Sequence, residues 1–235
     1  MRVGIIQSNY IPWRGYFDFI DDVDVFIFHD DLQYTKGDWR NRNRIKTGAG
    51  LQWLTVPVRY THVGQLIDEV SLDESQAWGR KHLNLLEANY RTAPYFQAYF
   101  KPFADVLGRT YPSISQLNIA LIRWVMGCLE IATPTVVSRE LNVTGSKTAR
   151  LIELLKKVDA SIYLSGPAAA DYLDLPSFEE HGIRLEYKSY DYQSYEQAGG
   201  GEFAPGVSIL DLLFNTGPEA RKYLKSRSAN QVIVS

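Results

Sequence analysis

The opening segment of the chain, residues 3–28, limits the possible folds most narrowly. Val3 to Gln7 is a short apolar run typical of a buried strand, and Val25 to Phe28 is a second such run. Between them, apolar residues recur at helical spacing from Trp13 to Val23. Strand, helix and strand in this order predict a βαβ unit, which favours a parallel sheet with a right-handed crossover.

The rest of the chain predicts an α/β class with helices grouped in the middle. Helical patterns occur at 75–88, 93–107 and 114–129. Strand candidates stand on both sides of them, at 51–60, 66–72, 134–138, 161–164 and 183–187. We therefore expect one domain over 1–235, built on a mainly parallel sheet, in which 75–130 forms a helical insertion or cap.

Composition excludes several classes of protein. The 235 residues, 45% hydrophobic and 22% charged, are enough to bury a sizeable core. With 25 Lys and Arg against 27 Asp and Glu, the formal charge is -2, and we expect no nucleic-acid partner. The single Cys128 cannot form an internal disulfide, and no apolar run reaches the roughly 20 residues of a membrane span. A cytoplasmic protein is expected.

The ends of the first two strands are the expected place for a site, because ligands of open α/β sheets bind beyond the carboxyl ends of the strands. Gln7 and Asn9 follow the first strand, and His29, Asp30 and Asp31 follow the second. Adjacent aspartates on a strand face opposite sides, so one of the two is expected in the cleft. It would bind hydroxyl groups or a divalent cation, and the alternative is a solvated turn with a helix cap. The pattern indicates no particular metal or cofactor.

A cationic segment at 36–46 is the sharpest local feature, because its arginines alternate with asparagines. If the segment is extended, the arginines share one face and the asparagines the other. Guanidinium groups bind phosphate or carboxylate bidentately, and amides suit sugar hydroxyls or base edges. We expect a phosphorylated ligand here, and the alternative is a solvated loop paired with nearby aspartates. The candidate ligand-binding residues of the segment are Lys36, Trp39, Asn41, Arg42, Asn43 and Arg44.

Two histidines compete for the role of general base. His82 lies one turn after Trp78 on the same face of a predicted helix. A neutral imidazole there would deprotonate an amine or hydroxyl nucleophile, and the alternative is a histidine packed under Trp78. His29 ends the second strand and is the rival candidate, with Asp30 as the third candidate catalytic residue.

Several segments together resemble a known family. They are 7–18, 30–36, 39–46 and 54–58, followed by Trp78, Lys81-His82, Tyr90, 93–96, 163–166 and 211–215. This combination covers nearly the whole chain and resembles the WbqC-like protein family. Two positions depart from the family's pattern, since Ser8 stands where proline is expected and Ile6 where histidine is frequent. A role that such a histidine has in relatives therefore does not carry over to Ile6.

The resemblance implies a function, because the family is named for a gene of bacterial O-antigen clusters. It implies a transferase that acts on a nucleotide-activated sugar or amino sugar in the biosynthesis of surface polysaccharide or glycosylated products. The partner expected is a phosphorylated or nucleotide-linked small molecule, with an acyl thioester as one candidate donor. The matching segments add Tyr10, Trp13, Tyr163 and Ser165 to the candidate ligand-binding residues.

Two other functions stay open at this point. The opening strand, turn, helix and strand resemble the start of the nucleotidyltransferase superfamily. However, Arg14-Gly15-Tyr16 stands where that superfamily has its His-x-Gly-His pair, which argues against adenylation. A non-catalytic binding protein of glycan assembly is the second alternative, because the sequence holds no unmistakable catalytic constellation.

Overall fold

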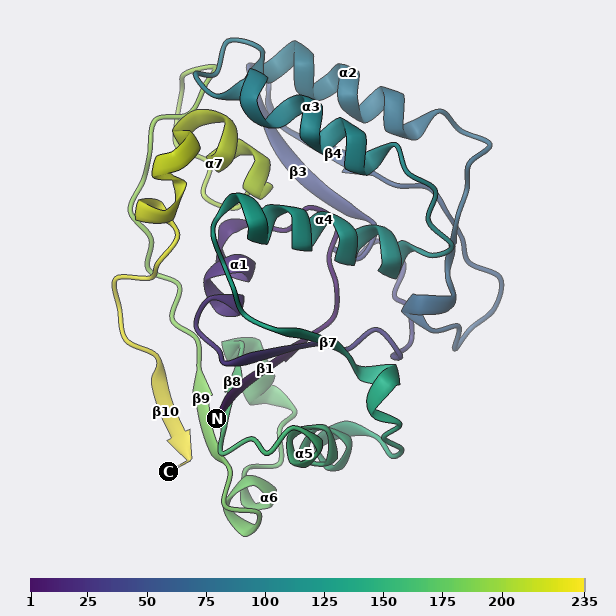
Figure 1. The fold of residues 1–235 in the computed structure, drawn as a ribbon, viewed down its shortest axis with the longest axis vertical. Helices are drawn as coiled ribbons and strands as arrows, with labels where there is room; N and C mark the ends of the chain where they lie inside the picture. Colours follow the sequence, from purple (N-terminus) through teal and green to yellow (C-terminus); the bar gives the residue numbers. More distant parts are fainter. Residues whose placement is uncertain (235) are drawn as a thin grey trace.

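A six-stranded sheet forms the centre of the fold (Figure 1). The structure is a computed structural model and describes residues 1–234. The strands of the sheet are β1 (Arg2–Ile6), β2 (Val25–Phe28), β7 (Thr135–Val137), β8 (Ile162–Ser165), β9 (Arg184–Tyr187) and β10 (Gln231–Val234). Their order is β10-β9-β8-β1-β2-β7, and only the edge strand β10 is antiparallel to its neighbour. The expected α/β class with a mainly parallel sheet is confirmed.

The order of the strands reverses beside β1. β2 and β7 extend the sheet on one side of β1, whereas β8 and β9 extend it on the other. The βαβ unit expected from the sequence is present, with Val3 opposite Val25 and Ile6 opposite Phe28 in parallel register. In an open α/β sheet the crevice at such a reversal is the usual place for a ligand.

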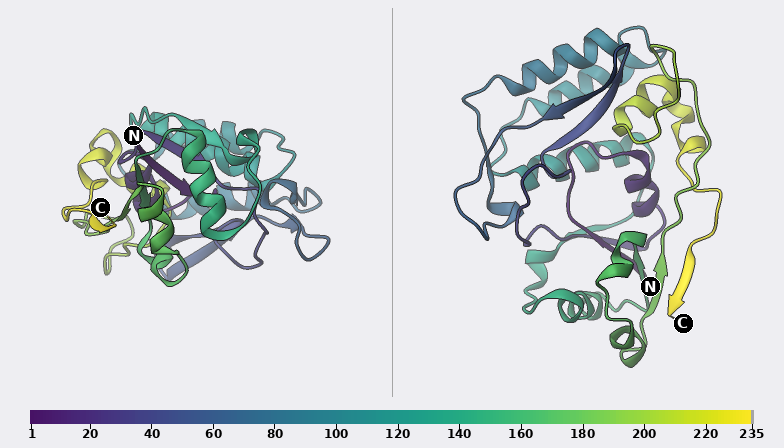
Figure 2. Two further views of the ribbon diagram at one scale, coloured as in Figure 1. Left: turned by 90° about the horizontal axis from the view of Figure 1, so that it is seen from below. Right: turned by 180° about the vertical axis from the view of Figure 1, so that it is seen from behind.

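Helices cover both faces of the sheet (Figures 1 and 2). One face is covered by α5 (Lys147–Lys157) and α6 (Leu175–Glu180), and the other by α1 (Arg14–Ile20), α4 (Ile114–Cys128) and α7 (Ile209–Thr216). Adjacent strand residues therefore belong to different clusters: Ile27 packs with Leu155 of α5, and Phe26 packs with Ile122 of α4. Burial on both faces explains why the central strands read as continuous apolar runs.

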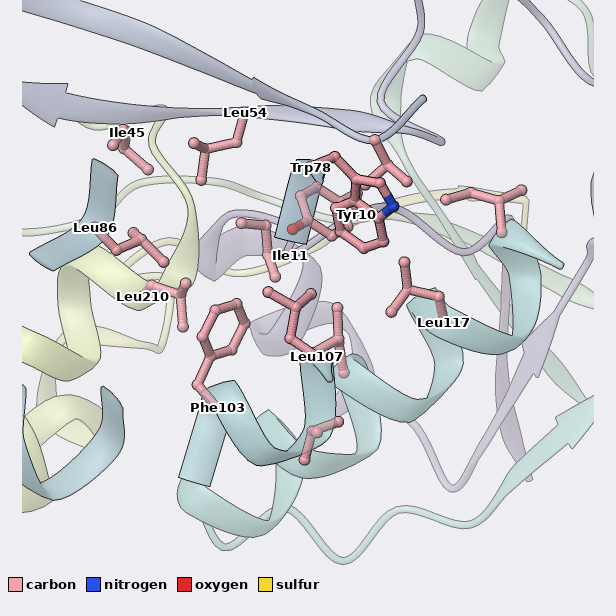
Figure 3. Packing of buried hydrophobic residues seen from close by; sticks show 14 of the residues in the cluster. Tyr10, Ile11, Ile45, Leu54, Trp78, Leu86, Phe103, Leu107, Leu117 and Leu210 are labelled. Atoms are coloured by element: carbon pink, nitrogen blue, oxygen red, sulfur yellow. The ribbon is translucent and has the colours of Figure 1, made fainter. Parts of the chain in front are cut away.

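A third layer lies beyond α4 and α7. It consists of the antiparallel hairpin β3 (Arg42–Thr47) and β4 (Gly50–Thr55), covered by α2 (Trp78–Tyr90) and α3 (Phe96–Leu107). Figure 3 shows Tyr10, Trp78 and Leu117 among the side chains that meet in this layer's core. The remaining short elements are β5 (Val58–Arg59), β6 (Ser71–Leu72), η1 (Ile67–Glu69), η2 (Ser138–Leu141), η3 (Pro167–Asp171) and η4 (Gly217–Tyr223).

The structure refines several sequence expectations. Segment 75–130 is divided between layers, because α2 and α3 cover the hairpin whereas α4 packs on the sheet. In the strand expected at 66–72, Ile67–Glu69 is instead the 3-10 turn η1 and only Ser71–Leu72 is a strand. The Glu69 carboxylate accepts the backbone N–H of Leu66. The edge strand β10 lies outside the strands expected from the sequence. Within residues 1–234, no helix combines the length and apolarity that crossing a membrane requires.

Close packing of α1 on β1 depends on Gly4. A Cβ at this position would lie 2.3 Å from Cε1 of Phe19. We predict that Gly4→Ala lowers the free energy of unfolding by ~1–3 kcal/mol, because the overpacked ring has to shift. Urea denaturation measures this. The control is Gly127→Ala in α4, where a Cβ meets no atom within 4 Å and alanine favours the helix. An equal loss of stability in both variants would contradict the prediction.

Candidate functional site

Two cavities lie beside the segment that follows β1. The first, called here the aromatic cavity, has a volume of about 280 Å³ and is lined by Asn9, Pro12, Trp13, Trp39, Asn43, Arg44 and Gly206. The second, called the switch-point cavity, has a volume of about 550 Å³ and is lined by Ile5, Ile6, Gln7, His29, Leu32, Lys147, Arg150, Leu151, Tyr163 and Tyr172. A larger cavity of about 810 Å³ lies among η1, α4 and η2, and none of the sequence-predicted site residues lines it.

The backbone that separates the two cavities is fastened by buried polar side chains. The Asp30 carboxylate accepts the N–H of Ser8 at 2.7 Å and the hydroxyl of Ser115. The Asn43 amide donates to the carbonyl oxygens of Tyr10 and Ile11, at 3.1 and 2.9 Å. Ile11 has a φ of +36°, which a β-branched residue rarely adopts, so Asn43 supports a strained turn at the edge of the site.

Asp30 and Asp31 point in different directions, as the sequence predicts for neighbours at a strand end. Asp30 is fully buried, and this burial raises its pKa despite the hydrogen bonds from Ser115 and Ser8. Asp31 instead accepts hydrogen bonds from Ser138 and Arg150. Neither forms part of a group of three or more metal-ligating side chains, and no such group occurs in the described part of the chain.

The aromatic cavity contains a cation without a partner. The Arg44 guanidinium lies 5.5 Å from the ring centroids of both Trp39 and Trp53, which are 5.4 Å from each other. Its Nε has no hydrogen-bond partner, and Arg44 forms no ion pair within residues 1–234. A guanidinium that lies beside two rings and has free donors is suited to bind a phosphate or carboxylate.

Trp13 also lines the aromatic cavity. Its ring lies 5.3 Å from the ring of Tyr190 and 5.7 Å from that of Tyr192. Gly206 completes the lining close to Arg44, since a Cβ there would come within 3.4 Å of a guanidinium nitrogen. The rings of Trp13 and Trp39, the Asn9 amide and one cation together suit a flat or sugar-like ligand that carries a negative charge.

Only part of the cationic segment 36–46 lines the aromatic cavity, namely Trp39, Asn43 and Arg44. Arg42 rests on Trp53 at 4.3 Å and donates to the carbonyl oxygen of Gly37. The Asn41 amide donates to the carbonyl oxygen of Val56, and the Lys36 ammonium lies over the ring of Tyr60 at 4.7 Å. The expected alternation holds along β3, but these three residues line neither cavity.

The switch-point cavity brings His29 together with Arg150. Arg150 donates its Nε–H to His29 Nε2 at 3.2 Å and also pairs with Asp31. Burial lowers the pKa of His29 to about 4, so its ring is neutral at pH 7. Because Nε2 accepts a hydrogen bond, the ring proton resides on Nδ1, which has no protein partner among the described residues.

His82 lies in the interior instead. The hydroxyl of Tyr10 and the carbonyl oxygen of Thr55 occupy its two ring nitrogens, at 2.9 and 3.2 Å. The ring packs edge-on against Trp78, and His82 lines neither cavity. Tyr10 is fully buried in the same cluster (Figure 3). A catalytic role for His82 stays a prediction, whereas these contacts give it a structural role.

Residues near β8 connect to the switch-point cavity, and some were not expected. Tyr163 lines the cavity, and the buried Ser165 donates to its hydroxyl at 3.3 Å. Lys147 and Arg150, on the first turn of α5, were missed as site residues. In the sequence, these two residues are cations at the start of a predicted amphipathic helix that follows a strand. This pattern is equally typical of a solvated helix end, so it does not by itself predict a binding site.

Comparisons with known proteins give matches along nearly the whole chain. A family model described as the WbqC-like protein family matches residues 7–223. A Mycobacterium tuberculosis protein named "Uncharacterized protein Rv1507c" is 47% identical over 231 residues, covering 95% of this chain and 97% of its own. No solved structure matches this chain.

The buried histidines predict a loss of stability in acid. Burial lowers the pKa of His82 from 6.5 to about 4, so the unfolded chain binds more protons than the folded protein between these pH values. Its contribution is fully present above pH 6.5 and is lost as the pH falls toward 4, by up to ~3 kcal/mol. His82→Asn should flatten this part of the profile of unfolding free energy against pH, measured by urea denaturation. His181→Asn, at an exposed position, should not flatten it. Equal flattening in both would refute the assignment.

Proposed function

Because the chain belongs to the WbqC-like protein family, we propose that it is a cytoplasmic transferase acting on a nucleotide-activated sugar or amino sugar. Its products would be bacterial surface polysaccharides or other glycosylated compounds. The observation that carries this proposal is the unpaired Arg44 guanidinium in the wall of the aromatic cavity. A buried or stacked cation with free donors favours a ligand that brings its own negative charge.

The proposed ligand matches the cavity part by part. Its phosphate accepts hydrogen bonds from Arg44, and its sugar or base lies against the rings of Trp13 and Trp39. Trp39 is 40% exposed without a ligand, and covering such a ring contributes to binding. The Asn9 amide is placed for a hydroxyl group, whereas Asn43 donates to the turn at Ile11 and accepts the backbone N–H of Arg44.

One observation favours a nucleotidyltransferase-like enzyme as the second candidate. The reversal of strand order beside β1 places a crevice where open α/β sheets bind nucleotides. The residues in place of the His-x-Gly-His pair, however, are used for packing. Arg14 donates to the carbonyl oxygens of Gln193 and Tyr223, and a Cβ on Gly15 would meet the Trp13 ring at 2.3 Å. The transferase is therefore the better supported reading.

A thermal-shift panel distinguishes these candidates, because a ligand that binds only the folded state raises the unfolding midpoint. The panel contains nucleotide sugars, nucleoside triphosphates with magnesium, and acyl-coenzyme A thioesters. A shift with a nucleotide sugar or a thioester supports the transferase and identifies one substrate. A shift with triphosphate alone favours the nucleotidyltransferase. No shift with any of them favours a binding protein for a carrier-linked glycan.

The role of Arg44 gives a sharper test. We predict that Arg44→Ala weakens binding of the stabilising nucleotide sugar at least roughly tenfold, since a charged hydrogen bond contributes about 1.5–3 kcal/mol. Isothermal titration calorimetry measures the affinity, and thermal unfolding confirms the fold. Arg91→Ala, at an exposed arginine at the end of α2, is the matched control. Arg42→Ala should have a smaller effect because Arg42 lies outside the cavity. Equal affinities in all four proteins would show that Arg44 is a solvated surface group.

A further inference from the structure

We propose that the switch-point cavity is a second binding site, which takes an organic oxyanion: a phosphate or carboxylate attached to an apolar body. This site is separate from the aromatic cavity, shares no lining residue with it, and does not rest on the proposed transferase activity. Four observations support it, namely the charge of the lining, a hydrogen-bond donor of His29 without a protein partner, the backbone conformation of Lys147 and the apolar part of the lining.

The charge of the lining is positive and incompletely balanced. Lys147 and Arg150 contribute cations, and no aspartate or glutamate lines the cavity. Arg150 is paired with Asp31, so its charge is compensated. Lys147 forms no ion pair in the described part of the chain, and its ammonium remains free for a ligand. One net positive charge beside a low-dielectric wall attracts an anion.

His29 supplies a directed hydrogen-bond donor. It lines the cavity although it is only 6% exposed. Its Nε2 is occupied by Arg150, so the proton on Nδ1 is the group that remains without a protein partner. An oxyanion bound in the cavity would accept a hydrogen bond from this N–H group. A cationic ligand would leave this donor unsatisfied.

The backbone of Lys147 is strained where it meets the cavity. Its φ is +53°, in the left-handed region that favours glycine, and it is the first residue of α5. The Ser146 side chain forms no cap hydrogen bond at this helix start. Non-glycine residues in such conformations are enriched at ligand sites. The strain thus agrees with a lysine that is retained for its ammonium.

The remainder of the cavity indicates what the anion is attached to. Ile5, Ile6, Leu32 and Leu151 give it an apolar floor, and Tyr172, which is 68% exposed, stands at its rim. A volume of about 550 Å³ lies within the range of small-molecule sites, roughly 300–1,000 Å³. A small organic acid or organic phosphate with an apolar portion fits these features better than a free inorganic ion.

The test uses two probes and a neutral analogue. Phenyl phosphate and phenylacetate carry the two candidate oxyanions on the same ring, and benzyl alcohol carries none. Calorimetric titrations are done on the full chain with Arg44→Ala, so that binding in the aromatic cavity does not contribute. We expect at least one anion to bind at least tenfold more tightly than benzyl alcohol. The tighter of the two identifies the source of the oxyanion. If neither anion binds more tightly than benzyl alcohol, the proposal is wrong.

Matched substitutions locate the binding. Lys147→Gly removes the ammonium while glycine accepts the left-handed backbone, so the fold should be retained. Lys157→Ala, at the far end of α5, is its control. The side-chain nitrogen of asparagine lies near the position of histidine Nδ1, so His29→Asn keeps the donor at that position. The side-chain nitrogen of glutamine lies near the position of Nε2, so His29→Gln removes the donor at Nδ1. We expect a roughly tenfold loss of affinity in Lys147→Gly and His29→Gln only. If both variants bind the anion as tightly as the protein without these substitutions, the proposed site is wrong. This outcome does not depend on how Arg44→Ala affects nucleotide-sugar binding.

Discussion

The buried carboxylate of Asp30 is the interaction on which the candidate site depends. It lies at the end of β2 and accepts hydrogen bonds from the backbone of Ser8, after β1, and from Ser115 of α4. A carboxylate without exposure is very costly unless it is hydrogen-bonded. Two strand ends and one helix must therefore meet at this point. The directions of Gln7 and Asn9 follow from that junction, and with them the positions of both cavities.

Hydrogen-bond capacity separates the structural polar residues from the candidate functional ones. His82 has both ring nitrogens committed to protein partners in the interior, namely Tyr10 and Thr55. Arg44 and His29 keep free donors at cavity walls. Since buried polar groups are normally satisfied, the exceptions at cavity walls are the informative ones.

Arg40 connects the two cavities. Its guanidinium donates to Oδ1 of Asn9 and, at 3.4 Å, to Oε1 of Gln7. Asn9 lines the aromatic cavity, and Gln7 lines the switch-point cavity. An occupant of either cavity therefore contacts a residue that this one arginine holds. The two cavities are thus linked by one side chain beside the segment that follows β1.

The sequence by itself determined the class of fold, because apolar runs and helical periodicity are local consequences of which faces are buried. It also predicted Asn9, Trp39 and Arg44 as site residues, since they lie close to a strand end or in one short segment. Tertiary structure alone decided that Arg42 and Lys36 stay outside, that His82 is enclosed, and that Lys147 and Arg150 of α5 join His29. The physical reason is that a side chain's free donors depend on which partners the fold brings within hydrogen-bond distance, and those partners come from segments far apart in the chain.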